Sequence, residues 1–142
     1  MFVAMLENVS LGRQMGIENP SILIVDDEPG VRCLLRLSFS AAGYDVHAAA
    51  DVPEAMGMCG AKYFDVVLTD VRMPGLTGHD LARWLAEHYP ATRSILMTGL
   101  DTGCDDCPIL GSCPVLAKPF DPKDAVSMVG AVLARHRKRP ET

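Results

Sequence analysis

The stretch SILIVDDEPG at residues 21–30 decides the fold that we expect for this chain. It opens with a short apolar run that contains several β-branched residues, which is typical of a strand buried on both faces of a parallel sheet. It then changes abruptly to acidic residues, Pro29 and Gly30, which we interpret as the loop that leaves the strand. A buried strand that leads into an acidic loop indicates an α/β fold.

The same alternation of short apolar runs with amphipathic segments continues along the chain. We expect strands at residues 21–25, 44–48, 64–69, 94–97 and 114–117. We expect a first helix at 31–42 and a second helix that is capped by Asp51. We expect a third helix at 78–89, capped by Thr77 with Asp80, and a last helix that is capped by Asp121. This order predicts a parallel sheet with helices on both faces.

One segment interrupts the alternation. Residues 100–113, LDTGCDDCPILGSC, contain two glycines, a proline and few periodic apolar residues, so the fourth helix is expected to be shortened or irregular. We expect residues 1–20 to be a poorly ordered extension, residues 21–137 to be one domain and residues 138–142 to be a tail.

The composition excludes several classes of protein. No apolar run approaches the length of a membrane helix, and the N-terminus lacks the features of a secretory signal, so we expect a cytoplasmic protein without membrane contact. The net charge of −5 argues against a nucleic-acid partner. The basic run at 135–139 is interpreted as the end of a last helix, where cations are favoured.

Polar side chains follow four of the predicted strands where each strand ends: Asp26 and Asp27, then Asp70, Thr98 and Lys118. The carboxyl ends of parallel strands meet at one rim of a sheet, so these side chains should lie together. Crowded carboxylates attract a hard cation such as Mg²⁺, while a lysine and a hydroxyl bind phosphoryl oxygens. Solvated loops explain any one acidic residue, but the whole set favours phosphoryl transfer to a carboxylate.

Four motifs carry a resemblance to a known family: IVDDE at 24–28, DVRMPGLTG at 70–78, MTG at 97–99 and KPF at 118–120. With these motifs the chain resembles the response-regulator receiver family from about residue 21 to residue 137. The resemblance implies a flavodoxin-like, doubly wound, five-stranded parallel sheet of order 2-1-3-4-5.

The resemblance also implies roles for the residues at the strand ends. Asp70 matches the phosphoacceptor. Asp27 matches a direct Mg²⁺ ligand, Asp26 a ligand through water, and the backbone carbonyl of Arg72 a further ligand. The hydroxyl of Thr98 is expected to move toward the phosphoryl group, and Lys118 to pair with it.

Three further positions bear on the resemblance. Gly99 is expected to leave room for the phosphoryl group. Val115 stands where the family usually carries an aromatic switch residue, and residues 100–113 replace the usual fourth helix. Both departures lie on the face that the family commonly uses for output.

The implied function is that of a phosphoacceptor in a two-component phosphorelay. We expect it to signal by altered protein–protein binding, with no attached output domain and with no enzymatic activity beyond its own phosphorylation and dephosphorylation. Expected partners are a sensor histidine kinase or a phosphotransfer protein, and an unknown downstream protein. An alternative is a phosphate sink that drains the kinase.

The cysteines leave a second alternative open. Cys104, Cys107 and Cys113 lie close together in the sequence and could be free thiols, form a disulfide, or bind a metal with a fourth ligand. A disulfide or a metal site would make the domain a redox- or metal-responsive module. Cys33 and Cys59 lie in predicted helices and are expected to be small core or half-buried residues.

Overall fold

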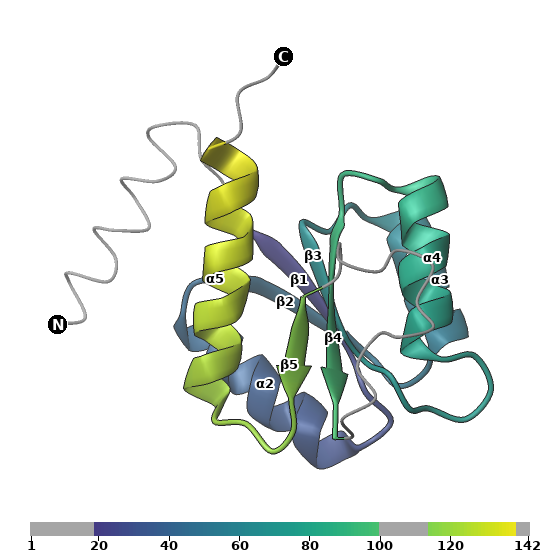
Figure 1. The fold of residues 1–142 in the computed structure, drawn as a ribbon, viewed down its shortest axis with the longest axis horizontal. Coiled ribbons are helices and arrows are strands. Elements are labelled where there is room, and N and C mark those ends of the chain that lie inside the picture. The colour runs from purple at the N-terminus through teal and green to yellow at the C-terminus, as the bar shows by residue number, and fades with distance from the viewer. Residues whose placement is uncertain (1–18, 100–113, 139–142) are drawn as a thin grey trace, which may run out of the picture.

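The computed structural model of the protein describes residues 19–99 and 114–138, in which helices and strands alternate (Figure 1). The strands are β1 (Ser21–Val25), β2 (Asp45–Ala49), β3 (Val66–Asp70), β4 (Arg93–Thr98) and β5 (Val115–Ala117). The helices are α2 (Pro29–Ala41), α3 (Val52–Ala61), α4 (Gly78–His88) and α5 (Pro122–Lys138).

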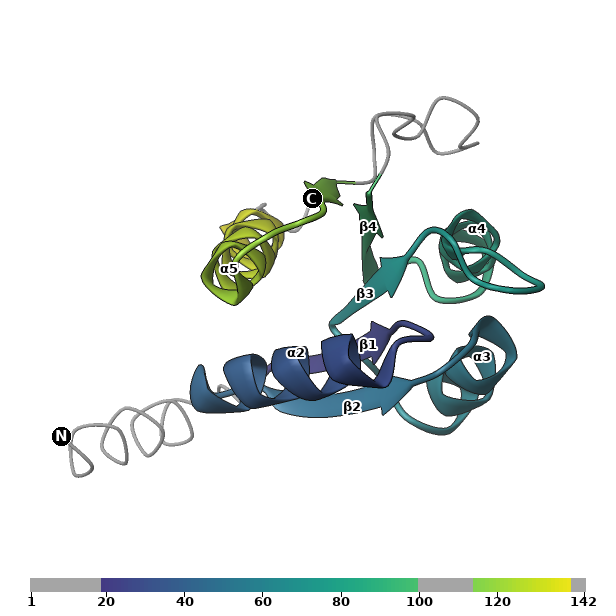
Figure 2. The ribbon, with the colours of Figure 1, turned by 90° about the horizontal axis from the view of Figure 1, so that it is seen from below.

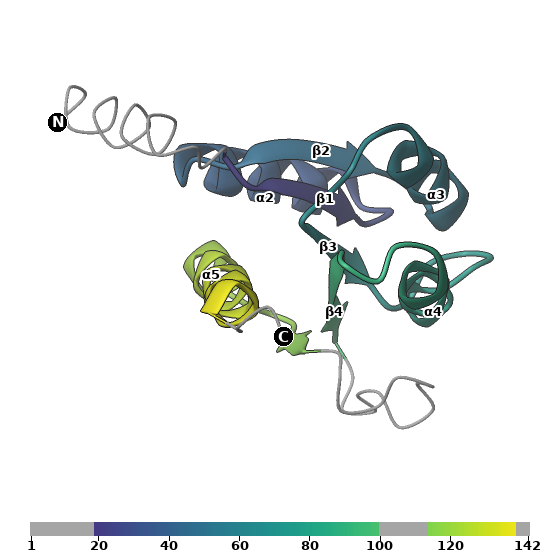
Figure 3. The ribbon, with the colours of Figure 1, turned by 90° about the horizontal axis from the view of Figure 1, so that it is seen from above.

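The strands form one five-stranded parallel sheet in the order β2-β1-β3-β4-β5. Helices α2 and α5 lie on one face of the sheet, and α3 and α4 lie on the other (Figures 2 and 3). This is the doubly wound order that the resemblance to the family implies, and the fold class is confirmed. Strand β1 pairs directly with β3, so the acidic loop that follows β1 lies next to the end of β3.

Two apolar layers hold the helices on the sheet, because successive side chains of each strand point to opposite faces. One layer joins β1, β3 and β4 to α2 and α5, with Ile24, Leu68 and Phe39 fully buried. The other joins β1, β2 and β3 to α3 and α4, with Val25 and Leu81 fully buried. The continuous apolar run of β1 is therefore explained by burial on both faces.

The helix starts follow capping chemistry. At α4, the Thr77 side chain accepts from the backbone N–H of Asp80, and the Asp80 carboxylate accepts from the backbone N–H of Thr77, which completes the predicted capping box. At α3, Asp51 caps Glu54, but the Glu54 carboxylate reaches the N–H of Ala50 at 2.8 Å, one residue earlier than a standard box requires.

Several predicted boundaries are wrong by one or two residues. Helix α2 begins at Pro29 and not at residue 31, because proline is well suited to the first position of a helix, where no N–H partner is needed. Cys33, expected to be at least half-buried, is exposed on α2, whereas Cys59 is buried as expected. Residues 1–18, 100–113 and 139–142 lie outside the described residues, and with them most of the predicted extension, the shortened fourth helix and most of the predicted tail.

Among the described residues, no helix combines the length and the apolar character that crossing a membrane would require.

Candidate functional site

Three carboxylates meet at the carboxyl end of the two central strands. Asp26 and Asp27 follow β1, and Asp70 is the last residue of β3, which pairs directly with β1. One oxygen from each carboxylate lies within 4.8 Å of the others. Asp26 is fully buried, Asp70 is buried at 7 % exposure, and Asp27 is exposed. The cluster therefore has a buried floor and one carboxylate open to solvent.

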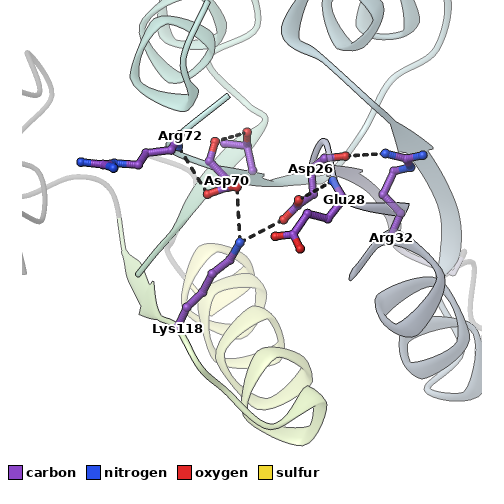
Figure 4. A network of polar contacts seen from close by, with 7 residues as sticks. Asp26, Glu28, Arg32, Asp70, Arg72 and Lys118 are labelled. Atoms are coloured by element: carbon purple, nitrogen blue, oxygen red, sulfur yellow. Dashed lines mark hydrogen bonds and ion pairs between the residues drawn. The ribbon is translucent and has the colours of Figure 1, made fainter. Parts of the chain in front are cut away.

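The Lys118 ammonium bridges the two buried carboxylates (Figure 4). Its Nζ lies 3.2 Å from Oδ2 of Asp26 and 3.3 Å from Oδ2 of Asp70. The lysine directly follows β5, and its backbone N–H donates to the carbonyl of Thr98 at 2.8 Å. The sheet pairing of β4 with β5 thus sets the position of the cation.

Backbone N–H groups orient the two buried carboxylates in the same way. Oδ1 of Asp26 accepts from the N–H of Glu28 at 2.9 Å, and Oδ1 of Asp70 accepts from the N–H of Arg72 at 3.3 Å. Each is a contact from a side chain to the backbone two residues on, which aspartate favours in turns. Each carboxylate therefore keeps its other oxygen, Oδ2, for Lys118.

An arginine of α2 also holds the acidic loop. Nη1 of Arg32 donates to the backbone carbonyl of Asp26 at 2.7 Å, as Figure 4 shows, and so ties the loop to the first turns of α2. The side chain of Arg72 points away from the carboxylates in the same view, so only its backbone faces them. Our sequence reasoning did not single out Arg32; the charge of an arginine six residues after Asp26 was a weak signal for this contact.

The electrostatics of the cluster are set by burial and by one cation. Burial raises the pKa of the Asp70 carboxyl above 3.8; the charge of Lys118 opposes this rise and that of Asp26 adds to it. Burial alone would lower the pKa of Lys118, but Asp26 and Asp70 outweigh it and hold the pKa above 10.5. Lys118 is therefore positively charged at neutral pH.

The donor set suits a hard divalent cation. Carboxylate oxygens are the ligands that such cations prefer, and a cation of the size of Mg²⁺ commonly takes one or two of them together with water. In residues 19–99 and 114–138, Asp26, Asp27 and Asp70 are the one cluster of three acidic, histidine or cysteine side chains with atoms close enough to hold an ion.

The other predicted residues lie at the same rim. Thr98 ends β4 and is 5 % exposed, and it follows Met97, the residue that pairs with Asp70 across the sheet. A Cβ added at Gly99 would lie 3.8 Å from Cβ of Lys118, which is ordinary contact, so a single methyl group fits there. Cys104, Cys107 and Cys113 lie outside the described residues, and their predicted alternatives stay predictions.

Comparisons with known proteins agree with this arrangement. Residues 22–130 match the family model of the response regulator receiver domain. The chain is 31% identical over 119 residues to the alkaline phosphatase synthesis transcriptional regulatory protein PhoP of Bacillus subtilis, a match that covers 82% of this chain and 50% of that protein. The chain spans about half the length of the curated relatives that it matches.

Two solved structures show the same fold. The chemotaxis protein CheY4 of Vibrio cholerae has a TM-score of 0.74 and 28% identity, with 80% of this chain and 98% of that chain covered. The response regulator TrrA of Thermotoga maritima, solved in complex with Mg²⁺-BeF, has a TM-score of 0.73 and 26% identity, with 80% and 98% covered. Because the family model covers most of the chain, the protein belongs to the response regulator receiver domain family.

Proposed function

We propose that this receiver domain accepts a phosphoryl group on Asp70 with the help of Mg²⁺ and changes its binding to partner proteins in response. The observation that carries the proposal is the bridge of Lys118 between Asp26 and Asp70 within a cluster of three carboxylates. A buried acid beside a fixed cation and a set of metal ligands is the arrangement that phosphoryl transfer to a carboxylate needs.

The metal ligands in this proposal come from two loops. Asp27, the exposed carboxylate of the cluster, would bind Mg²⁺ directly, and Asp26 would contribute through water. Asp70 and the backbone carbonyl of Arg72 would complete the protein ligands. When bound, Mg²⁺ supplies positive charge that neutralises the oxygens of the phosphoryl group. The TrrA relative, solved with Mg²⁺-BeF, supports this choice of ion.

Asp70 is the nucleophile. A carboxylate oxygen attacks phosphorus, a P–O bond forms, and the bond from phosphorus to the donor's leaving atom breaks, so that the product is an acyl phosphate. Burial of Asp70 removes competing water from the nucleophile, and the charge of Lys118 opposes the rise in the pKa of Asp70 that burial causes. After transfer, Lys118 pairs with a phosphoryl oxygen and Thr98 donates its hydroxyl to another.

The proposed partners follow from the family. The donor is a sensor histidine kinase or a phosphotransfer protein of the cytoplasm, and the receiver of the signal is a further protein. The curated relative PhoP is a transcriptional regulator about twice as long as the matched part. For this chain, the absence of a nucleic-acid contact stays a prediction, based on its net charge of −5.

Acetyl phosphate with and without Mg²⁺ tests the proposal directly. Intact mass should show one added phosphoryl group on the parent protein with Mg²⁺ and none with a chelator. Asp70→Asn should abolish the labelling, because an amide does not attack phosphorus. Asp51→Asn is the matched control, since asparagine also caps a helix and position 51 lies at the start of α3. Equal labelling of the Asp70→Asn and Asp51→Asn proteins would contradict the assignment.

A further inference from the structure

We infer that Gly78 is a positioning residue of the acceptor site: it lets the start of α4 rest against the peptide bond of Asp70 and thereby fixes the Asp70 carboxylate. A Cβ at this position would overlap the carbonyl oxygen of Asp70. It would also lie 3.0 Å from both the carbonyl carbon of Asp70 and Cα of Val71. This inference rests on the proposed role of Asp70.

The contact is between backbone and backbone, so a flexible side chain cannot move aside to relieve it. After β3, the chain leaves the sheet at Val71, whose N–H donates to the carbonyl of Met97 at 2.9 Å. It then returns, and the N–H of Gly78 donates to the carbonyl of Val71 at 3.0 Å. The first residue of α4 is therefore tied to the residue that follows the acceptor.

Both sides of the contact are held firmly. The Thr77–Asp80 capping box fixes the start of α4, and Leu81 anchors the helix with no exposed surface. On the other side, β3 is paired with β1 and β4. A methyl group at position 78 must therefore shift the Asp70 peptide, lift the start of α4, or do both.

A small shift of the Asp70 peptide is enough to disturb the site. The carboxylate keeps its place through two contacts of 3.3 Å, one to Nζ of Lys118 and one to the N–H of Arg72. Both are already long for hydrogen bonds with a nitrogen donor, so a movement of a few tenths of an ångström breaks them. Arg72 also provides the backbone carbonyl that we propose as a metal ligand.

The other helical glycines show that this requirement is local. A Cβ at Gly57 in α3 or at Gly130 in α5 would meet nothing within 4 Å, and both residues are exposed. Alanine at either place should strengthen its helix, because alanine is the better helix former. Alanine at position 78 should do the same by propensity alone, so any loss there reports the contact with Asp70.

The test compares Gly78→Ala with Gly57→Ala and with the parent protein, and also places Gly78→Ala in a Gly57→Ala/Gly130→Ala background. The parent's Mg²⁺-dependent labelling by acetyl phosphate checks the proposed function separately. For folded Gly78→Ala we expect the labelling rate at saturating acetyl phosphate to fall by about tenfold or more, in line with the cost of misplacing a reacting group. Mg²⁺ affinity, measured by calorimetry, should fall with it, while Gly57→Ala keeps both values.

A matched loss of stability separates positioning from folding. Leu133→Ala removes a buried side chain of α5 on the opposite face of the sheet, away from the acceptor loop. It should lower the free energy of unfolding and leave the labelling rate and Mg²⁺ affinity of the folded protein unchanged. A folded Gly78→Ala protein with the parent's rate and affinity would overturn the inference. Failure to fold even in the stabilised background would assign Gly78 a purely structural role and overturn it as well.

Discussion

Replacing the acceptor carboxylate with its neutral amide should stabilise the metal-free protein. The change is Asp70→Asn, which removes one charge and keeps the shape of the side chain. Asp70 is buried at 7 % exposure, and it shares the site with Asp26 and Asp27. The sign of the effect depends on whether the attraction of Lys118 outweighs the repulsion and the cost of burial.

The Coulomb energies of the site nearly cancel. At an effective dielectric constant of about 20, Lys118 at 3.3 Å attracts the Asp70 charge by about 5 kcal/mol. Asp26, within 4.8 Å, repels it by about 3.5 kcal/mol at that limit, and the exposed Asp27 adds about 1 kcal/mol through water. Burial therefore decides the outcome, and removing the charge should gain about 1–2 kcal/mol.

The pH dependence gives an independent check of the sign. The folded state holds the pKa of Asp70 above 3.8, so it binds a proton more tightly than the unfolded chain does. The ionised Asp70 carboxylate therefore lowers the free energy of unfolding when the pH is above the ordinary range of carboxyl pKa values. This effect disappears as the pH falls below 3.8. The advantage of Asp70→Asn should be full at neutral pH and should vanish in acid.

Urea unfolding followed by circular dichroism, with a chelator present, measures the difference. A gain of this size moves the midpoint by about 1 M at the usual dependence on urea. Mg²⁺ should stabilise the parent more than Asp70→Asn. Asp45→Asn is the control, for which we expect a loss of stability. Asp45 is half exposed and contacts Lys62 and His47, and these contacts outweigh burial and hold its pKa below 3.8. A metal-free Asp70→Asn protein that is less stable than the parent at neutral pH would refute the reasoning.

Three further predictions concern the cation, the metal and the thiols. Lys118→Ala should lower the metal-free free energy of unfolding at pH 7 by about 3 kcal/mol, since it strands the buried Asp26 carboxylate, and Mg²⁺ should recover part of the loss in urea unfolding. Because the carboxylates raise the pKa of Lys118 above 10.5, its contribution should disappear only as the pH rises through that raised value. Asp27→Ala should weaken Mg²⁺ binding by about tenfold or more in calorimetry, and unchanged affinity would count against its role as a ligand. Peptide mapping after brief alkylation should find Cys33 modified and Cys59 protected until the protein unfolds, because Cys59 is buried with a pKa of about 11; equal rates would contradict this.

The fold was predictable because each helix and strand has a signal in its own stretch of sequence. Local signals of this kind are the apolar run of β1, the capping residues Thr77 and Asp80, and the proline at the start of α5. Each indicates a strand or a helix without information from distant parts of the chain. The gathering of Asp26, Asp70 and Lys118 was predictable because parallel topology places all strand ends at one rim.

The contacts within the site were less accessible from the sequence. Both Asp26 and Asp27 follow the same strand, and only the path of the loop makes the first of them the buried partner of Lys118. The sequence shows Gly78 as the first residue of a predicted helix and the last residue of a family motif, but it does not show the close approach of this glycine to a residue eight positions earlier. Such features depend on the distance between backbones, which no pattern of residue types records.

The bridge between Asp26 and Lys118 joins residues that are 92 positions apart. A ribosome makes the chain from its N-terminus, so all three acids emerge before their cation does. During that interval the three carboxylates lack the cation that bridges two of them in the folded protein. The acceptor centre is completed only when the edge strand of the sheet is added, and a chain cut short before residue 118 carries the acids without the cation that the finished fold provides.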